Sequence, residues 1–204
     1  MKFRNLIGSL GLVGALGFSP KVSAEDTGYL DMSREEILGV LTQRAVVLND
    51  SNFKHEVLDY DGDAIVLYNS SCNRTELADS VDRNMEIVYL QLIEKFKDTH
   101  VRELPLKFGV FDGCRFVGNN ASTIIGLEVT TLETHMYVDG REIDRMRGGP
   151  KNEIGLTNKL NDMILWIEYT LLGIRQLEDQ DKDVVALYKG DGILEAYPRS
   201  EIQR

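Results

Sequence analysis

A strand-like run that ends at a cysteine dominates the sequence between Ala64 and Thr75. Its first part, Ile65–Tyr68, is apolar, of strand length and rich in β-branched and aromatic residues. A short polar break follows, then Cys72, and a long helical pattern begins directly after it. The pattern predicts a buried strand that delivers Cys72 to a helix N-terminus, where free N–H groups and the helix dipole favour a thiolate.

Other elements follow from hydrophobic periodicity and from turn and capping signals. Ser33 and Glu36 form a capping box that starts a short amphipathic helix. Apolar residues at steps of three and four predict two long helices, over 73–97 and 151–172, and a shorter one is expected over 119–127. Strands are predicted at 45–48, 64–68, 106–111, 132–138 and 141–146.

Two hairpins complete the prediction. Asp139-Gly140 joins the strands at 132–138 and 141–146 and is the strongest hairpin signal in the chain. A second hairpin is expected near the C-terminus, between 184–188 and 193–197. Helical crossovers early in the chain imply parallel strands, and the late hairpin adds antiparallel ones, so the sequence predicts an α/β domain with a mixed sheet.

In order and spacing, 44–173 resembles the thioredoxin superfamily. Leu48–Phe53 looks like the Leu-x-Asp-x-Asn-Phe start of such domains, Ile65–Thr75 is similar to their central strand and redox turn, and 136–148 resembles their closing hairpin. The resemblance implies a thioredoxin-like fold, a mixed central sheet flanked by helices, here with a short N-terminal helix and a C-terminal extension.

The chain departs from the family pattern at two positions. The redox turn of the family is Cys-x-x-Cys, whereas here Cys72 is followed three residues later by Thr75. The family also has a cis-proline before the hairpin, but 126–133 contains no proline, and Thr131 or Leu132 stands near that point. A non-proline cis bond costs about 2.5–4 kcal/mol, so we expect a trans peptide there. Both departures argue against ordinary dithiol oxidoreductase chemistry.

The candidate catalytic residues are Cys72 as a nucleophile, Thr75 as a hydrogen-bond donor to its thiolate, and Cys114 as its partner. Cys114 follows the strand expected beside the central one, so it should leave the same sheet edge as Cys72. Three interpretations of Cys114 stay open: a resolving thiol, half of a structural disulfide with Cys72, or an unpaired core cysteine. Cys72 itself has an alternative, a buried or oxidised cysteine without a role.

The N-terminus has the pattern of a secretory signal peptide. Basic Lys2 and Arg4 precede an apolar segment over 6–18, and Val22-Ser23-Ala24 provides small residues at a cleavage site. We therefore expect cleavage after Ala24, an exported protein in the periplasm or outside the cell, and no stable membrane insertion after cleavage. The expected organisation is 1–24 signal peptide, 25–43 N-terminal helical segment, 44–173 thioredoxin-like domain and 174–204 C-terminal extension.

The chain is strongly acidic, with a formal charge of −10. The signal segment holds three basic and no acidic residues, so the mature chain carries −10 − 3, or −13, by the same counting. Such a surface repels phosphate backbones and makes nucleic acid an improbable partner. The three histidines are widely spaced and no His/Cys cluster has zinc spacing, so we expect no cofactor and no metal.

Two hypotheses of function remain. One is an exported thioredoxin-like protein with atypical or reduced redox activity, exchanging disulfides of protein partners through the single thiol of Cys72. The other is a redox-inactive thioredoxin-fold module that binds proteins in the manner of a chaperone. The state and reactivity of the two cysteines separate these hypotheses.

Overall fold

The computed structural model describes residues 28–69, 76–101, 104–112, 132–172, 184–188 and 194–198. The helical elements are η3 (Tyr29–Asp31), α1 (Arg34–Arg44), η4 (Lys54–Leu58), α2 (Glu76–Phe96), α4 (Glu153–Ile167) and η5 (Glu168–Leu172). The strands are β1 (Val46–Val47), β2 (Asp63–Asn69), β3 (His100–Val101), β4 (Leu104–Pro105), β5 (Lys107–Asp112), β6 (Glu133–Val138), β7 (Arg141–Arg147), β8 (Val184–Tyr188) and β9 (Leu194–Pro198).

Five strands form one mixed sheet in the order β1-β5-β2-β6-β7. β1 and β2 both run parallel to β5, whereas β6 is antiparallel to β2 and β7 is antiparallel to β6. β2 is therefore the central strand, as the sequence predicts. This order and these directions are those of a thioredoxin-like fold, which confirms the expected fold class.

The hairpin that closes the sheet has the predicted turn. Asp139 and Gly140 both have positive φ, 49° and 72°, as a two-residue type I′ turn requires. The turn sets the register of β7, in which Arg141 pairs with Val138 and Arg147 with Glu133, with one irregularity beside Met136. The predicted pairing of 141–146 with 132–138 is therefore confirmed.

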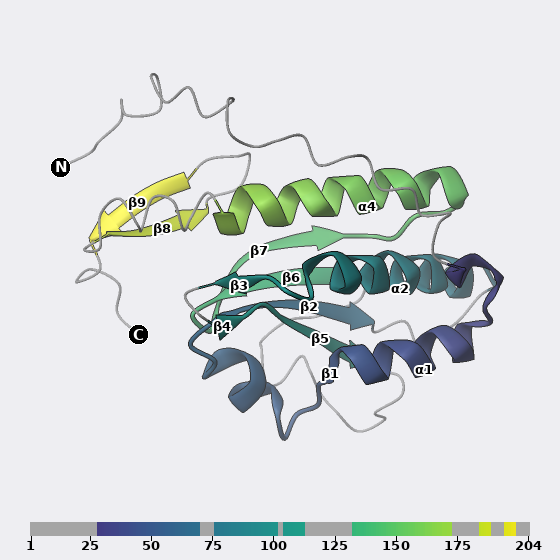
Figure 1. Cartoon of the computed structure of the whole chain (residues 1–204), viewed down its shortest axis with the longest axis horizontal. Coiled ribbons are helices and arrows are strands. Elements are labelled where there is room, and N and C mark those ends of the chain that lie inside the picture. Colours follow the sequence, from purple (N-terminus) through teal and green to yellow (C-terminus); the bar gives the residue numbers. More distant parts are fainter. Residues whose placement is uncertain are drawn as a thin grey trace.

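One face of the sheet packs against α1, α2 and α4, and Figure 1 shows α2 lying between the other two helices. The predicted stripes of both long helices point into this core: Met85, Val88, Leu92 and Phe96 from α2, and Leu160, Ile164, Ile167 and Leu171 from the second helix and its continuation.

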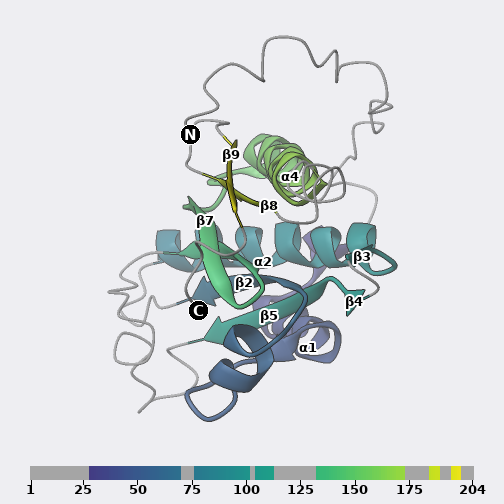
Figure 2. The same cartoon turned by 90° about the vertical axis from the view of Figure 1, so that its left-hand side faces the viewer.

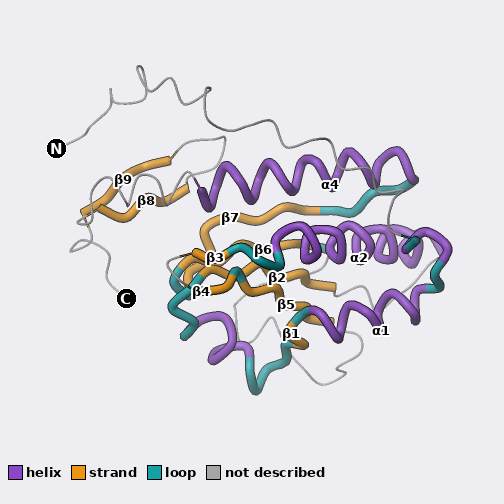
Figure 3. The backbone as a smooth tube through the Cα atoms, in the orientation of Figure 1, coloured by secondary structure: helices purple, strands orange, loops and turns teal. Residues whose placement is uncertain are grey.

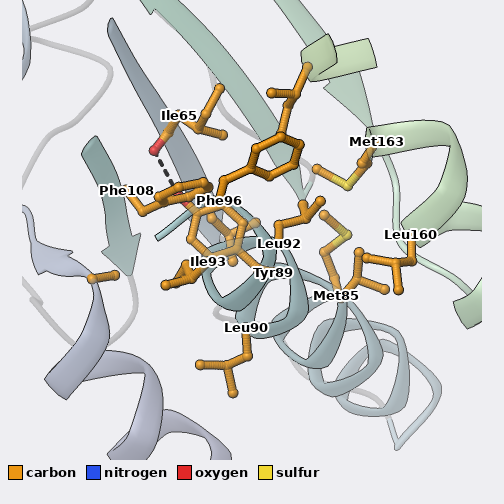
Figure 4. Packing of buried hydrophobic residues seen from close by; sticks show 14 of the residues in the cluster. Ile65, Met85, Tyr89, Leu90, Leu92, Ile93, Phe96, Phe108, Leu160 and Met163 are labelled. Carbon is orange, nitrogen blue, oxygen red and sulfur yellow. Dashed lines mark hydrogen bonds between the residues drawn. The ribbon is translucent and has the colours of Figure 1, made fainter. Parts of the chain in front are cut away.

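Tyr89 gives this core a polar anchor. It is fully buried, and its hydroxyl lies 2.7 Å from the carbonyl oxygen of Ile65 in β2 (Figure 4). The same hydroxyl lies 2.7 Å from the carbonyl oxygen of Gly109 in β5. Burial raises the pKa of Tyr89 well above its ordinary value, so the hydroxyl keeps its proton and donates it. One side chain of α2 thus ties two parallel strands together.

The opposite face of the sheet carries a second, smaller core. Aromatic side chains dominate it: Phe53 beside η4, Tyr68, Phe111 and Tyr137. Phe53 and Val57, in the segment that follows β1, are buried here. In the structure this segment is a single π-helical turn.

Two arginines hold the N-terminal segment on α2. Arg34, at the start of α1, makes a two-pronged contact with Glu86, with N–O distances of 3.2 and 2.8 Å, and both side chains are buried. Arg83 donates to the backbone carbonyls of Leu30 and Met32. The predicted capping box of Ser33 and Glu36 is also present. The segment before β1 therefore belongs to the folded unit.

The C-terminal strands β8 and β9 form a separate antiparallel hairpin beyond the end of α4 (Figures 2 and 3). The predicted terminal hairpin is thus confirmed, and β8 contacts β7. Among the described residues, no helix is long and apolar enough to cross a membrane.

The differences from the predicted elements lie mostly at element ends. The strand expected at 45–48 pairs only over Val46–Val47, and the helix predicted at 151–172 changes to π-helical hydrogen bonding after Ile167. The short β3–β4 ribbon has no counterpart in the prediction, because two-residue strands carry no periodicity. The helix expected over 119–127 lies outside the described residues.

Candidate functional site

The three candidate catalytic residues, Cys72, Thr75 and Cys114, lie outside the described residues. The structure does describe the strands that lead to them. β2 ends at Asn69 and its parallel neighbour β5 ends at Asp112, and these two last residues are paired in the sheet. Both strands therefore end at one level of the same sheet edge, as expected for parallel neighbours.

Two further segments meet near this edge, against the first half of α2. The amide N–H of Gly148, after β7, donates to the carbonyl of Leu132, before β6. A Cβ on Gly149 would lie 2.9 Å from a methyl carbon of Leu132 and 2.9 Å from the carbonyl oxygen of Val81. Only glycine allows the loop to approach α2 this closely. Tightly packed backbone thus borders the sheet edge at which β2 and β5 end.

A buried amide completes this junction. Asn84 of α2, with 7% of its surface exposed, donates from its side-chain nitrogen to the carbonyl oxygen of Pro150 at 3.1 Å. No cis peptide bond occurs among the described residues. The Leu132–Glu133 bond is therefore trans, whereas the bond that precedes Leu132 involves Thr131, which is not described.

An open cleft of about 510 Å³ adjoins this junction. It lies between α2, the start of α4 and the N-terminal segment, and it is lined by Leu30, Ser80, Arg83, Asn84, Lys151, Asn152 and Ile154. Asn152 caps α4 by accepting from the N–H of Gly155. Apart from its two aliphatic side chains, the lining consists of hydrogen-bonding groups, two of them cationic.

A buried histidine cluster lies on the other face of the sheet. His135 of β6 has no exposed surface, and its two ring nitrogens each face a carboxylate: Nε2 lies 2.9 Å from Glu133 and Nδ1 lies 3.2 Å from Glu142. Arg145 and Arg147 of β7 pair with these glutamates, at 3.1 Å to Glu142 and 2.9 Å to Glu133. Charges of both signs thus alternate across two neighbouring strands.

The pKa of Glu142 in this cluster reflects two opposing effects. Burial raises the pKa of Glu142, but the hydrogen bond and charge of His135 and the charge of Arg145 outweigh burial, and the pKa lies below its ordinary value. Glu142 therefore stays ionised beside the ring.

Two tyrosines cover the same histidine. The ring of Tyr68, the residue before the last of β2, lies 4.5 Å from the ring of His135, and its hydroxyl lies 2.8 Å from that of Tyr137. Burial raises the pKa values of both tyrosines, so both remain neutral donors. The cluster thus joins β2, β6 and β7 through ring contacts, a tyrosine–tyrosine hydrogen bond and ion pairs.

Sequence reasoning did not single out this cluster. His135 stands in an apolar strand and, as a single histidine, resembles an ordinary core residue. A signal is nevertheless present, because Glu133, His135 and Tyr137 share one face of β6 by period-two alternation. The other two histidines, His55 and His100, are exposed. Among the described residues, no three His, Cys, Asp or Glu side chains are arranged so that they could hold a metal ion.

Comparisons with known proteins complete the description. No protein-family model and no curated protein matches the chain. Among solved structures it is similar to thioredoxin f2 of Chlamydomonas reinhardtii, at 13% identity over 61% of this chain and 94% of that one, with a TM-score of 0.40.

Two further solved chains are similar to this one. The thioredoxin of Trypanosoma brucei brucei has 16% identity over 59% of this chain and 90% of that one, with a TM-score of 0.37. A chain in a structure of thiol resolution in yeast mitochondrial 1-Cys peroxiredoxin via glutathione/thioredoxin systems has 15% identity over 59% and 96%, with a TM-score of 0.39.

Proposed function

We propose that this chain, which has a thioredoxin-like fold, exchanges disulfides of protein partners through a single attacking thiol, Cys72, with Cys114 as the resolving thiol. Its activity is lower than that of a Cys-x-x-Cys enzyme, because Thr75 cannot form a disulfide. The observation that carries the proposal is the pairing of Asn69 with Asp112 at the ends of two parallel strands.

This pairing brings the chain segments of the two cysteines to one sheet edge. Cys72 follows Asn69 by three residues and Cys114 follows Asp112 by two. An extended residue spans at most about 3.6 Å, and neighbouring strands lie about 4.8 Å apart. The chain length after each strand thus permits the Cα separation of about 5.5 Å that a disulfide requires.

The first step is attack of the Cys72 thiolate on one sulfur of a partner disulfide. A bond forms between Cys72 and that sulfur, the partner's S–S bond breaks, and the other partner sulfur leaves as a thiolate that takes up a proton from water. The side-chain hydroxyl of Thr75, one helical turn after Cys72, is proposed to stabilise the attacking thiolate.

The second step releases the partner. The Cys114 thiolate attacks the sulfur of Cys72, an intramolecular disulfide forms, and the partner leaves with its second thiol. The partner gains two electrons and this protein loses two. A low-molecular-weight or protein dithiol must then reduce the Cys72–Cys114 disulfide before another cycle.

Export and the division of the chain belong to the same proposal. A signal peptide over 1–24 would direct the protein out of the cytoplasm, where disulfides of exported proteins are available as substrates. The thioredoxin-like domain over 44–173 would carry the chemistry, and the segments 25–43 and 174–204 would be additions to the thioredoxin-like pattern. The acidic surface is the reason to propose protein partners rather than nucleic acid or an anionic membrane.

The decisive experiment compares single-cysteine variants of the full mature chain. We expect Cys72→Ser to abolish reduction of a model protein disulfide, and Cys114→Ser to accumulate mixed disulfides that mass spectrometry maps to Cys72. Thr75→Ala should raise the pH midpoint of Cys72 alkylation, and the midpoint of the parent protein should lie below the free-thiol value of about 8.5.

A different outcome would identify a binding module. If the two cysteines form a permanent structural bridge, either serine variant should lose roughly 2–4 kcal/mol of stability and trap no partner. If Cys72 alkylates with a midpoint near about 8.5 and no bridge or mixed disulfide is found, the thiol proposal is wrong. The chain would then be a redox-inactive binding protein.

A further inference from the structure

We infer that the cleft between α2 and the start of α4 binds an acidic, partly apolar segment of the partner polypeptide. The inference rests on the proposed function for the partner's class, but the contacts that support it are independent of any cysteine.

The cleft carries positive charge that described carboxylates do not neutralise. Among the described residues, Arg83 donates only to neutral backbone carbonyls, and neither Arg83 nor Lys151 forms an ion pair. This is unusual for a chain with a formal charge of −10, in which many other described arginines and lysines pair with glutamate or aspartate. The unpaired charge makes an anionic group the complementary ligand.

The remaining polar groups of the lining are matched to the same ligand. Ser80 and the side-chain nitrogen of Asn84 are donors, and Asn84 is held in place by its bond to Pro150. The first amides of α4 add the positive end of a helix dipole at the mouth of the cleft. Among the described lining residues none is acidic, so a carboxylate meets donors on several sides.

Two aliphatic side chains of the cleft favour a polypeptide over a small inorganic anion as its ligand. Ile154 is 78% exposed and Leu30 is half-buried, and both border the cationic groups. A phosphate ion gains nothing from such neighbours, whereas a segment with Leu or Val beside Glu or Asp buries apolar area against them. The volume of about 510 Å³ falls within the usual range for ligand sites, about 300–1,000 Å³.

The position of the cleft fits a partner that reaches the thiol. Ser80 and Asn84 lie about 6 and 12 Å along α2 from Glu76, the first described residue of the helix, at a rise of about 1.5 Å per residue. Cys72 precedes Glu76 by four residues. A polypeptide held in the cleft therefore lies alongside the helix that follows the proposed nucleophile.

The test measures binding without thiol chemistry. The probe is a short fluorescein-labelled peptide rich in Glu, Asp and Leu and free of cysteine, titrated with the full mature chain and followed by fluorescence anisotropy. We expect binding that weakens with salt, and Lys151→Glu should weaken it by about five- to tenfold, since it replaces an attraction with a repulsion. Lys54→Glu, at an exposed lysine of η4 on the other face of the sheet, should leave it unchanged.

A second pair of variants tests the apolar part. Ile154→Ser should reduce affinity several-fold, whereas Leu165→Ser, at another exposed apolar residue of α4, should have no effect. The inference would be overturned if the cleft variant and its control variant lost the same affinity in either pair. Equal binding of a peptide with Gln and Asn in place of Glu and Asp would also overturn it. Full competition by inorganic phosphate without an effect of Ile154→Ser would also overturn it, in favour of a simple anion site.

Reduction of glutathione disulfide, which is too small to need the cleft, separates this inference from the proposed function. If the parent protein exchanges glutathione disulfide normally but does not bind the peptide, the inference about the cleft is wrong and the proposed function stands. Normal peptide binding by a protein that exchanges no disulfide refutes the thiol chemistry alone and leaves the cleft as the site of a binding module.

Discussion

At the residue scale, the least expected feature is a histidine with a carboxylate at each ring nitrogen and no contact with solvent. Removing charge from water is costly, and the cost is offset only while every member keeps its partner. His135, Glu133 and Glu142 are therefore interdependent, and deleting the ring removes the buried partner that lies between the two carboxylates.

A histidine substitution tests this dependence. His135→Leu should lower the free energy of unfolding by about 3–5 kcal/mol, because it leaves the buried Glu133 and its neighbour Glu142 without the ring between them. The matched control is His55→Leu, whose ring is exposed and whose change should stay within about 0.5 kcal/mol. Urea denaturation of both variants measures the difference. Similar midpoints for the two would show that the cluster contributes no stability.

Glu142 makes the same network sensitive to acid. Its pKa is lowered in the folded state, since His135 and Arg145 outweigh the opposing effect of burial. A group with a depressed folded pKa contributes stability above its unfolded pKa of about 4.3 and loses it as pH falls through the lower folded value. Stability should therefore fall with pH below about 5, and less steeply in Glu142→Gln. Parallel pH profiles for variant and parent would contradict this.

At the element scale, the loop between β7 and α4 approaches α2 too closely for a side chain at Gly149. Gly149→Ala should destabilise the protein by about 1–3 kcal/mol, because the new Cβ would overlap Leu132 and the carbonyl of Val81. Gly39→Ala, in the middle of α1 with no atom within 4 Å of its new Cβ, should instead stabilise by about 0.5–1 kcal/mol. Thermal denaturation of both variants measures the two changes in stability. An unchanged stability of Gly149→Ala would mean that the loop moves to make room for the new Cβ.

The sequence predicted elements with strong local signals and missed those without them. The hairpin followed from Asp139-Gly140, and the two long helices followed from stripes such as Leu160–Ile164, because turn chemistry and periodicity are local properties. The β3–β4 ribbon and the π-helical turns at η4 and η5 have no such signature. The histidine cluster and the cleft depend on residues that only the folded chain brings together, so neither could be identified from spacing alone.

At the scale of the whole molecule, the charge balance opposes compaction. A formal charge of −10 in 204 residues means that acidic groups repel one another across the surface. Added salt screens these exposed charges, with a Debye length of about 10 Å at 0.1 M, more than it screens the buried pair of Arg34 and Glu86.

The melting temperature should therefore rise with moderate NaCl at neutral pH. The same salt series near pH 4.8, the isoelectric point of the sequence, should show little or no increase, because net repulsion is absent there. Differential scanning calorimetry gives both series on one protein preparation. A decrease with salt at neutral pH would indicate that exposed ion pairs dominate the electrostatics instead.

The central position of β2 also governs when the chain can fold. Both of its neighbours come later in the sequence, so Ile65 finds its partner in Phe108 only after a long crossover, and its other partner, Met136, later still. The chain loses entropy when these long loops close, and no contact compensates for that loss until the strands have paired. Folding is therefore slow, in the millisecond-to-second range typical of non-local topologies. A ribosome-bound chain that has not yet emerged beyond Val138 lacks one whole side of its central strand. We therefore expect the apolar β2 segment to remain without its sheet partners during synthesis until β5 and β6 have emerged.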